Sequence, residues 1–117
     1  MLKDLIIYQK HYDLILYAFP IIAQYPRNAR FTLGQETQNC MIDIARLIVR
    51  ANAERDRRRR RELLWTIDRG LQELRMLTRL AKDLHMLSVK KYGLMNVRIT
   101  EIGRLIGGWI KATADRK

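Results

Sequence analysis

The stretch "LLWTIDRGLQELRMLTRLAKDLHMLS", residues 63–88, decides the fold of this 117-residue chain. Apolar and small side chains recur in it at alternating steps of four and three residues, the spacing of one stripe on an amphipathic α-helix. The stripe consists of Leu63, Ile67, Gly70, Leu74, Leu77, Ala81, Leu84 and Ser88, and Leu64, Leu71 and Leu80 widen it. The spacing predicts one helix over residues 58–88, about 45 Å long at about 1.5 Å per residue.

Three further segments show the same kind of stripe, so the sequence predicts helices over residues 2–25, 33–54, 58–88 and 96–114. The first stripe consists of Met1, Leu5, Tyr8, Tyr12, Ile15, Phe19 and Ile22, and the second of Leu33, Thr37, Cys40, Ile44, Leu47 and Ala51. The last consists of Ile99, Ile102, Ile106, Trp109 and Ile110. No segment alternates with period two over the length of a strand, so the chain is expected to be all-α. Four helices with short turns predict a single domain, residues 1–117, folded as an antiparallel up-down-up-down four-helix bundle.

Turn and cap residues mark the predicted helix ends. Pro26, in "QYPRNARFT", is expected to end the first helix. Thr32 is predicted to be the N-cap of the second helix, with Gln35 as its capping-box partner. The third helix is expected to end at "KKYG", where Gly93 is the predicted break.

The composition bounds the class of protein. A hydrophobic fraction of 48% excludes disorder over most of the chain. The longest apolar stretch, residues 14–23, contains Pro20 and is far shorter than the roughly 20 residues of a membrane span. The single cysteine, Cys40, can form no internal disulfide, which fits a reducing compartment. We therefore expect a soluble, intracellular protein without a signal peptide or a membrane contact.

Positive charge is concentrated in the second half of the chain. Residues 1–54 hold six Lys and Arg against five Asp and Glu, whereas residues 55–117 hold seventeen against seven, within a net charge of +11. This asymmetry favours a polyanionic partner, of which nucleic acid is the commonest. A basic surface that serves only solubility is the alternative.

Six of the positive charges lie in "RDRRRRREL", residues 55–63. A helix turns about 100° per residue, so five consecutive arginines cover about 400°, and a run in mid-helix would bury some of them unpaired. The run is therefore predicted to lie at the start of the third helix, on the open rim of the bundle, with Arg60 on the inward side. A solvated charged turn without a role is one alternative. A nuclear-import tag is disfavoured because helices are predicted on both sides.

Further basic residues follow on the outer side of the third helix and beyond it. Arg75, Arg79 and Lys82 share a stripe at i, i+4 and i+7, which suits contacts to phosphates that position a protein without reading bases. The predicted nucleic-acid-binding residues are Arg55, Arg57, Arg58, Arg59, Arg60, Arg61, Arg69, Arg75, Arg79, Lys82, Lys90 and Lys91.

Large apolar side chains also point away from the predicted seam. Trp65, Met76 and Met86 are expected on the outside of the third helix, where such groups mark an interface between protein chains. They predict self-association. Aromatic residues on the outer faces are few, so base stacking on single strands is the weaker expectation.

No residue pattern typical of catalysis is found. A di-iron bundle needs Glu-x-x-His pairs, and no glutamate here has a histidine three residues later. His11 and His85 are isolated, and no Cys/His cluster has zinc spacing. Cys40 is expected to be a buried small hydrophobe. We therefore expect a protein that is not an enzyme and holds neither a cofactor nor a metal.

Two stretches carry a resemblance to a known family: "QYPRNARFTLGQ", residues 24–35, and "GRLIGGWIKA", residues 103–112. They resemble the four-helix-bundle proteins that include the accessory variability determinant (Avd) of diversity-generating retroelements. Related proteins are encoded in intervening sequences of bacterial large-subunit ribosomal RNA genes. Tyr25 stands where the family often has Phe. The signature residues are Tyr25, Pro26, Arg27, Arg30, Phe31, Leu33, Gly34 and Gln35, followed by Gly107, Gly108 and Trp109.

The resemblance implies a homopentameric ring of bundles with a basic surface and no catalytic activity. It implies that the chain binds RNA or DNA and associates with the reverse transcriptase of the retroelement. Together these proteins copy a template RNA mutagenically into cDNA that diversifies a target gene. It further implies a bacterial or phage-encoded protein of the cytoplasm. A ribosomal RNA intervening-sequence-type bundle protein and an oligomeric protein-protein adaptor stay open as alternatives.

The first signature also has a physical interpretation. Pro26 is expected to fix the turn, and Phe31 to staple the start of the second helix. Gly34 is expected to allow a neighbouring helix to approach closely. Arg27 and Arg30 are expected either to cap the carbonyl end of the first helix or to face a partner.

The second signature places two glycines inside a helix. Gly107 and Gly108 each cost about 1 kcal/mol relative to alanine, which tight packing within or between subunits would offset. Trp109 is then expected to be an anchor in the bundle or at a subunit boundary.

Overall fold

The computed structural model describes residues 2–114 as a helical bundle with principal extents of 50 × 23 × 19 Å. The helices are α1 (Leu2–Ile22), α2 (Arg27–Ala29), η1 (Arg30–Gly34, π-helical), α3 (Gln35–Ala53), α4 (Arg57–Asp83) and α5 (Val89–Ala114). No strand occurs in the described part of the chain, so the all-α prediction is confirmed. None of the helices described is long and apolar enough to cross a membrane.

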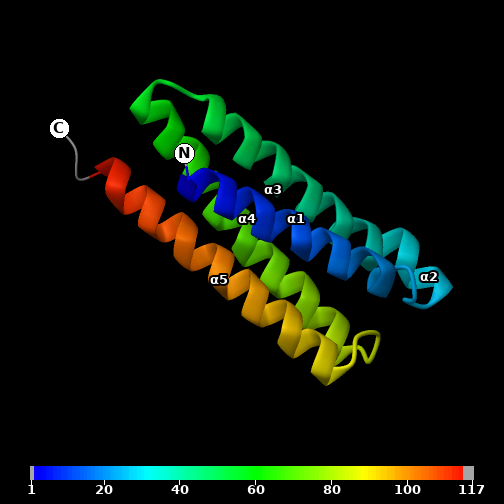
Figure 1. Cartoon of the computed structure of the whole chain (residues 1–117). Coiled ribbons are helices and arrows are strands. Elements are labelled where there is room, and N and C mark those ends of the chain that lie inside the picture. Colours follow the sequence, from blue (N-terminus) through cyan, green and yellow to red (C-terminus); the bar gives the residue numbers. More distant parts are fainter. Residues whose placement is uncertain (1, 115–117) are drawn as a thin grey trace.

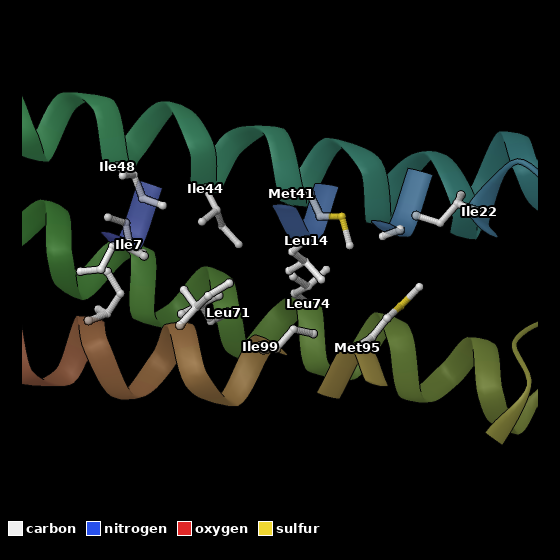
Figure 2. Close-up of a cluster of buried hydrophobic side chains, with 14 of the residues drawn as sticks. Ile7, Leu14, Ile22, Met41, Ile44, Ile48, Leu71, Leu74, Met95 and Ile99 are labelled. Carbon is white, nitrogen blue, oxygen red and sulfur yellow. The ribbon is translucent and has the colours of Figure 1, made fainter. Parts of the chain in front are cut away.

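The four long helices surround one core. α1 packs against α3 and α5, and α4 packs against the same two helices from the other side. In Figure 1 the α1–α2 and α4–α5 turns lie at one end of the bundle, and the α3–α4 turn lies at the other. Figure 2 shows side chains of all four helices, such as Ile7, Ile44, Leu71 and Ile99, meeting between them.

The buried stripe of α4 differs from the predicted one by a small rotation. It consists of Leu64, Ile67, Leu71, Leu74, Thr78 and Ala81, a strict heptad spacing. Of the predicted stripe, Leu63, Gly70 and Leu77 are only half-buried, Leu84 is exposed and Ser88 lies beyond the helix. Leucines occupy both sides of the true seam, so the sequence pattern alone does not fix which side turns inward.

The predicted stripe of α1 is largely wrong. The buried residues are Ile7, His11, Leu14, Ala18 and Ile22, of which only Ile22 was expected. Of the others, Tyr8 and Tyr12 are exposed, Leu5 is 65% exposed, Ile15 and Phe19 are half-buried, and Met1 lies outside the described residues. Apolar residues cover both faces of this helix, and a histidine in the middle of the buried stripe hides that stripe from a hydrophobic pattern.

The other two stripes agree better with the sequence. On α5 the whole predicted set, from Ile99 to Ile110, is buried, so that prediction is confirmed. On α3 the predicted Thr37, Ile44 and Ala51 are buried, whereas Leu33, Cys40 and Leu47 are half-buried at its margin. Met41 and Ile48 complete the buried stripe of α3.

The second helical segment begins earlier than predicted. Pro26, in an extended conformation, precedes α2, and α2, η1 and α3 follow one another without a break from residue 27 to residue 53. The Thr32 hydroxyl donates to the carbonyl oxygens of Asn28 at 3.3 Å and Ala29 at 3.4 Å, so it lies inside this helical segment. The predicted Thr32–Gln35 capping box is therefore wrong, because a threonine that bonds back to earlier carbonyls is not an N-cap.

The turn between α4 and α5 also lies earlier than predicted. His85 has a positive φ of 62°. The Met86 N–H donates to Ala81 at 2.8 Å and the His85 N–H to Lys82 at 3.0 Å, which is the Schellman pattern of a helix end. α5 then begins at Val89, so the predicted break at Gly93 is wrong and Gly93 lies inside α5.

Replacement of His85 by glycine is expected to stabilise the protein by about 0.5–1 kcal/mol. A left-handed conformation costs a residue with a Cβ roughly 1–2 kcal/mol, and the extra freedom of glycine in the unfolded chain returns part of that gain. Urea unfolding of His85→Gly measures the change. His85→Ala is the control, because it keeps the Cβ and should gain nothing; equal stabilisation by both would contradict the assignment.

His11 is expected to make stability depend on pH. His11 is 1% exposed, Nε2 donates to the Met41 carbonyl at 2.7 Å, and Nδ1 has no partner among the described residues. Burial lowers the pKa of His11, although the bond to Met41 acts in the opposite direction. The folded pKa thus lies below the unfolded value near 6.5, and the contribution to stability is complete above that value.

As the pH falls through the window below 6.5, the free energy of unfolding should decrease by up to about 1.4 kcal/mol per pH unit. Urea titrations between neutral and mildly acidic pH measure the slope. His11→Gln offers an amide donor to Met41 and does not titrate, so its slope should be smaller. A slope identical in both proteins would assign the effect to other groups.

Candidate nucleic-acid interface

The arginine run lies at the start of α4, as its sequence predicts. The Asp56 carboxylate is the N-cap of α4 and accepts the Arg59 N–H at 2.9 Å. The Glu54 carboxylate in turn accepts the Asp56 N–H at 3.1 Å. The carboxylates of Glu54 and Asp56, at the start of the run, are therefore bonded to backbone donors around the α3–α4 turn.

One arginine of the run has a structural role. The half-buried Arg60 donates from Nε to the Glu54 carbonyl at 3.0 Å, and a second guanidinium nitrogen bonds the same oxygen. Glu54 is the C-cap of α3, so this guanidinium lies at the negative end of that helix dipole. Arg60 thus closes the α3–α4 turn and is less available to a ligand than its neighbours.

The other arginines of the run, apart from Arg57, are exposed to solvent. Arg57 is half-buried and lines a cleft of about 210 Å³ with Arg60, Trp109, Ala112 and Thr113. Within the described residues, none of the exposed side chains of the run forms an ion pair. These exposed residues, which we call the rim arginines, are Arg55, Arg58, Arg59 and Arg61.

The predicted stripe in the middle of α4 is partly engaged inside the protein. Arg75 donates to the Thr100 hydroxyl at 3.0 Å and to Asn96 at 3.4 Å, which ties α4 to α5. Arg79 lies 3.8 Å and Lys82 3.0 Å from the Asp83 carboxylate. Lys82 also lies 5.0 Å from the centre of the Tyr92 ring. These charges are consequently less free than the rim arginines.

The structure does not bring all twelve predicted residues together. Lys90 and Lys91 are exposed in the first turn of α5, at the opposite end of the bundle from the rim arginines (Figure 1). The 27 residues of α4 separate the two ends by about 40 Å. Arg69 lies between them on the outside of α4 and donates to the Thr66 hydroxyl at 3.1 Å. Two basic clusters therefore occur, and the rim arginines form the denser one.

The first signature is partly buried and partly exposed. Tyr25 is buried, its hydroxyl has no hydrogen-bond partner in the described part of the chain, and burial raises its pKa. A Cβ on Gly34 would lie 3.2 Å from Ile22 and 3.5 Å from the Tyr25 ring, so the expected close approach is found. Phe31 is 72% exposed, and the expectation that it staples the helix start is wrong, because the helix begins before it.

The polar residues of that signature face outward. Arg27, Arg30 and Gln35 are exposed, and in the described structure neither arginine caps the end of α1. Arg30, Phe31 and Gln35 line a groove of about 450 Å³ between α1 and the η1–α3 segment. A partner-facing role is the interpretation that remains for them.

The second signature differs in its two parts. Trp109 is 8% exposed and packs in the core at the end of α5. Gly107 and Gly108 are exposed, and a Cβ on either would meet nothing within 4 Å. The expected tight packing is therefore not found within residues 2–114, and packing between subunits stays a prediction.

A second exposed surface was missed by the sequence patterns, because several of its residues had been placed inside. We call it the α1–α3 face. The Tyr8 and Tyr12 rings stack on it with centroids 6.0 Å apart. Tyr8, Ile42 and Val49 line a groove of about 360 Å³ there. The large exposed apolar residues of the face are Leu5, Tyr8, Tyr12, Leu16, Phe31, Ile42 and Val49.

Cys40 is only half-buried, and its thiol donates to the Gly70 carbonyl at 3.4 Å. Burial, followed by the charges of Glu73, Asp43 and Glu36, raises the pKa of Cys40 to about 11. The thiol is therefore protonated at neutral pH and is a poor nucleophile. No group of three His, Cys, Asp or Glu side chains that could hold a metal ion occurs among the described residues.

A bundle with a basic rim and an apolar side face is thus the class of protein that the geometry defines. The chain matches the bAvd-like family model over residues 5–113 and belongs to that family. None of the curated proteins compared with it matches significantly.

Alanine is expected to have opposite effects on stability at a closely packed glycine, Gly34, and at an exposed one, Gly108. Gly34→Ala should destabilise the protein by about 1–2 kcal/mol, because the new Cβ would lie 3.2 Å from Ile22 and 3.3 Å from the Ala29 carbonyl. Gly108→Ala should stabilise the isolated chain by about 0.5–1 kcal/mol, because its Cβ meets open space.

Thermal unfolding of both variants and sedimentation velocity test this contrast. If Gly108 packs against a second copy, its alanine variant should sediment as a smaller species although its helix is stabilised. Stabilisation by Gly34→Ala would contradict the close approach.

Proposed function

We propose that this chain is a non-catalytic, nucleic-acid-binding accessory protein of a diversity-generating retroelement. In this role it holds RNA or DNA and the reverse transcriptase together during mutagenic cDNA synthesis in the cytoplasm of a bacterial cell. Membership of the bAvd-like family supports the accessory role. The observation that carries the binding role is the cluster of rim arginines without an ion pair among the described residues.

The mechanism follows from electrostatics. Arginine guanidinium groups bind phosphates with two parallel hydrogen bonds and release condensed counterions from nucleic acid. Backbone contacts of this kind hold the polymer irrespective of its sequence. A protein that must accept a template RNA and its cDNA copy needs this tolerance.

Assembly would multiply the binding surface. We infer an up-down-up-down order of the helices from the positions of the three turns (Figure 1) and propose that the bundles associate into a homopentameric ring. The α1–α3 face supports self-association, because exposed apolar surfaces of this kind mark protein interfaces. In such a ring the rim arginines recur in every subunit, and binding gains from multivalency.

The α1–α3 face also supports a second candidate function. An oligomeric adaptor would use this apolar surface and meet an acidic protein through the rim arginines. A ribosomal RNA intervening-sequence-type protein would share the bundle without the retroelement role. Binding of nucleic acid by the purified chain separates the first alternative from the proposed function.

Replacing Arg58 and Arg59 by glutamate is expected to weaken nucleic-acid binding without unfolding the protein. The dependence of log affinity on log salt concentration should become shallower by about two, because about 0.9 counterion is released per phosphate contact. Both residues lie in the first turn of α4, where glutamate complements the helix dipole, so stability should rise by a few tenths of a kcal/mol per residue. Fluorescence anisotropy over a salt series and urea unfolding measure the two effects.

The matched control is Lys90→Glu with Lys91→Glu. It makes the same change of charge in the first turn of α5, at the other end of the bundle. This control variant should lose only the part of the affinity that comes from the net charge of the protein. Equal losses in both double variants would show that net charge alone attracts the polymer. Wild-type binding that is absent or insensitive to salt would exclude the proposed function.

A further inference from the structure

We propose that Trp65, flanked by arginines on the outer face of α4, is a stacking platform for the bases of single-stranded nucleic acid. The inference rests on the proposed nucleic-acid binding. It adds to that function the place where a base binds and the preference for a single strand. Positive charge alone determines neither.

Trp65 points away from the core. It is 46% exposed, whereas the adjacent Leu64 and the nearby Ile67 are fully buried. These residues fix which face of α4 packs in the core. The indole therefore cannot turn inward unless this packing is lost. A half-exposed indole offers an aromatic face on which a base can stack.

Three basic residues lie near Trp65 on the same face of α4. Arg58, Arg61 and Arg69 are seven residues before, four before and four after it, and all three are exposed. Residues at such spacings share one side of a helix. Arg61 and Arg69 each lie about 6 Å along the helix axis from the indole, one on either side. A base stacked on the ring thus has a guanidinium in each direction for its flanking phosphates.

The indole is not covered by these arginines in the folded chain. The cation–π contacts among the described residues involve Lys82 with Tyr92 and Arg98 with Tyr17. Arg69 is drawn to the Thr66 hydroxyl at 3.1 Å. Part of the Trp65 surface, 46% of which is exposed, is consequently open to a ligand.

Two carboxylates oppose the ligand at this site: the half-buried Asp68, three residues after Trp65, and Glu62. Glu62 is exposed and, three residues before Trp65, lies on the same side of α4. Its charge repels phosphates, so its removal should strengthen binding. This gives the proposal a test in the favourable direction.

A single strand fits this surface better than a duplex does. The faces of paired bases are stacked on one another inside a duplex, whereas a single strand can splay a base onto an aromatic ring. The arginines alone would bind both forms. Trp65 therefore supplies the preference between them.

Fluorescence anisotropy tests the proposal. It compares binding of a labelled single strand with binding of the duplex of the same sequence, at equal ionic strength. Trp65→Ala should weaken single-strand binding by about tenfold or more and leave duplex binding and the salt dependence nearly unchanged. Trp65→Phe should retain most of the affinity, and Glu62→Gln should raise it. Met76→Ala removes another exposed apolar side chain of α4 and should have little effect.

The chain has two tryptophans, so Trp109→Phe leaves Trp65 as the only indole fluorophore. Its emission should be quenched by the single strand and much less by the duplex. The wild type and Trp65→Ala could bind the single strand equally tightly and with the same salt dependence. That result would overturn the stacking site and leave the proposed function standing. If Trp65→Ala instead reduces the sedimenting mass and leaves single-strand affinity intact, the ring is a contact between protein chains. Binding of neither form by the wild type would remove the proposed function as well.

Discussion

The burial of one stripe of α4 is the constraint on which the rest of the structure depends. This helix packs between α3 and α5, and the heptad from Leu64 to Ala81 supplies its fully buried residues. When one face of a helix is buried, the rotation of the helix about its axis is fixed, and the opposite face must point to solvent. Arg58, Trp65 and Arg69 are therefore held on the outer face by the packing of their neighbours, so the core of α4 fixes where the basic surface lies.

The two ends of α4 show how the charge of the run is accommodated. Positive side chains at a helix start oppose the dipole of that helix. Here the start of α4 adjoins the carbonyl end of α3, and Arg60 bonds to the C-cap residue Glu54 there. The negative end of one helix thus offsets the positive charge gathered at the start of the next. At the far end the Schellman turn at His85 ends α4 before a second basic cluster begins.

The sequence predicts the helices well and their orientation less well. The stripe of α5 is correct because the exposed residues beside it, such as Arg104, Gly107 and Gly108, are polar or glycine, whereas α1 is apolar on both sides and carries His11 in its buried stripe. The position of the run on the rim follows from helix geometry alone. The structural role of Arg60 does not, because it depends on where α3 ends in space. The exposure of Phe31 was missed for a related reason, since the helix start moved ahead of it.

The separation of the two exposed surfaces bears on how one small chain could serve two partners. α1 and α4 lie across the bundle from each other, each packed between α3 and α5. The apolar α1–α3 face belongs to the nearly neutral part of the chain, and the outer face of α4 to the part that carries most of the net charge. Copies that associate through the first surface would leave the second open to solvent. A ligand bound along α4 would then not compete with assembly, so substitutions on the outer face of α4 can impair binding without impairing assembly.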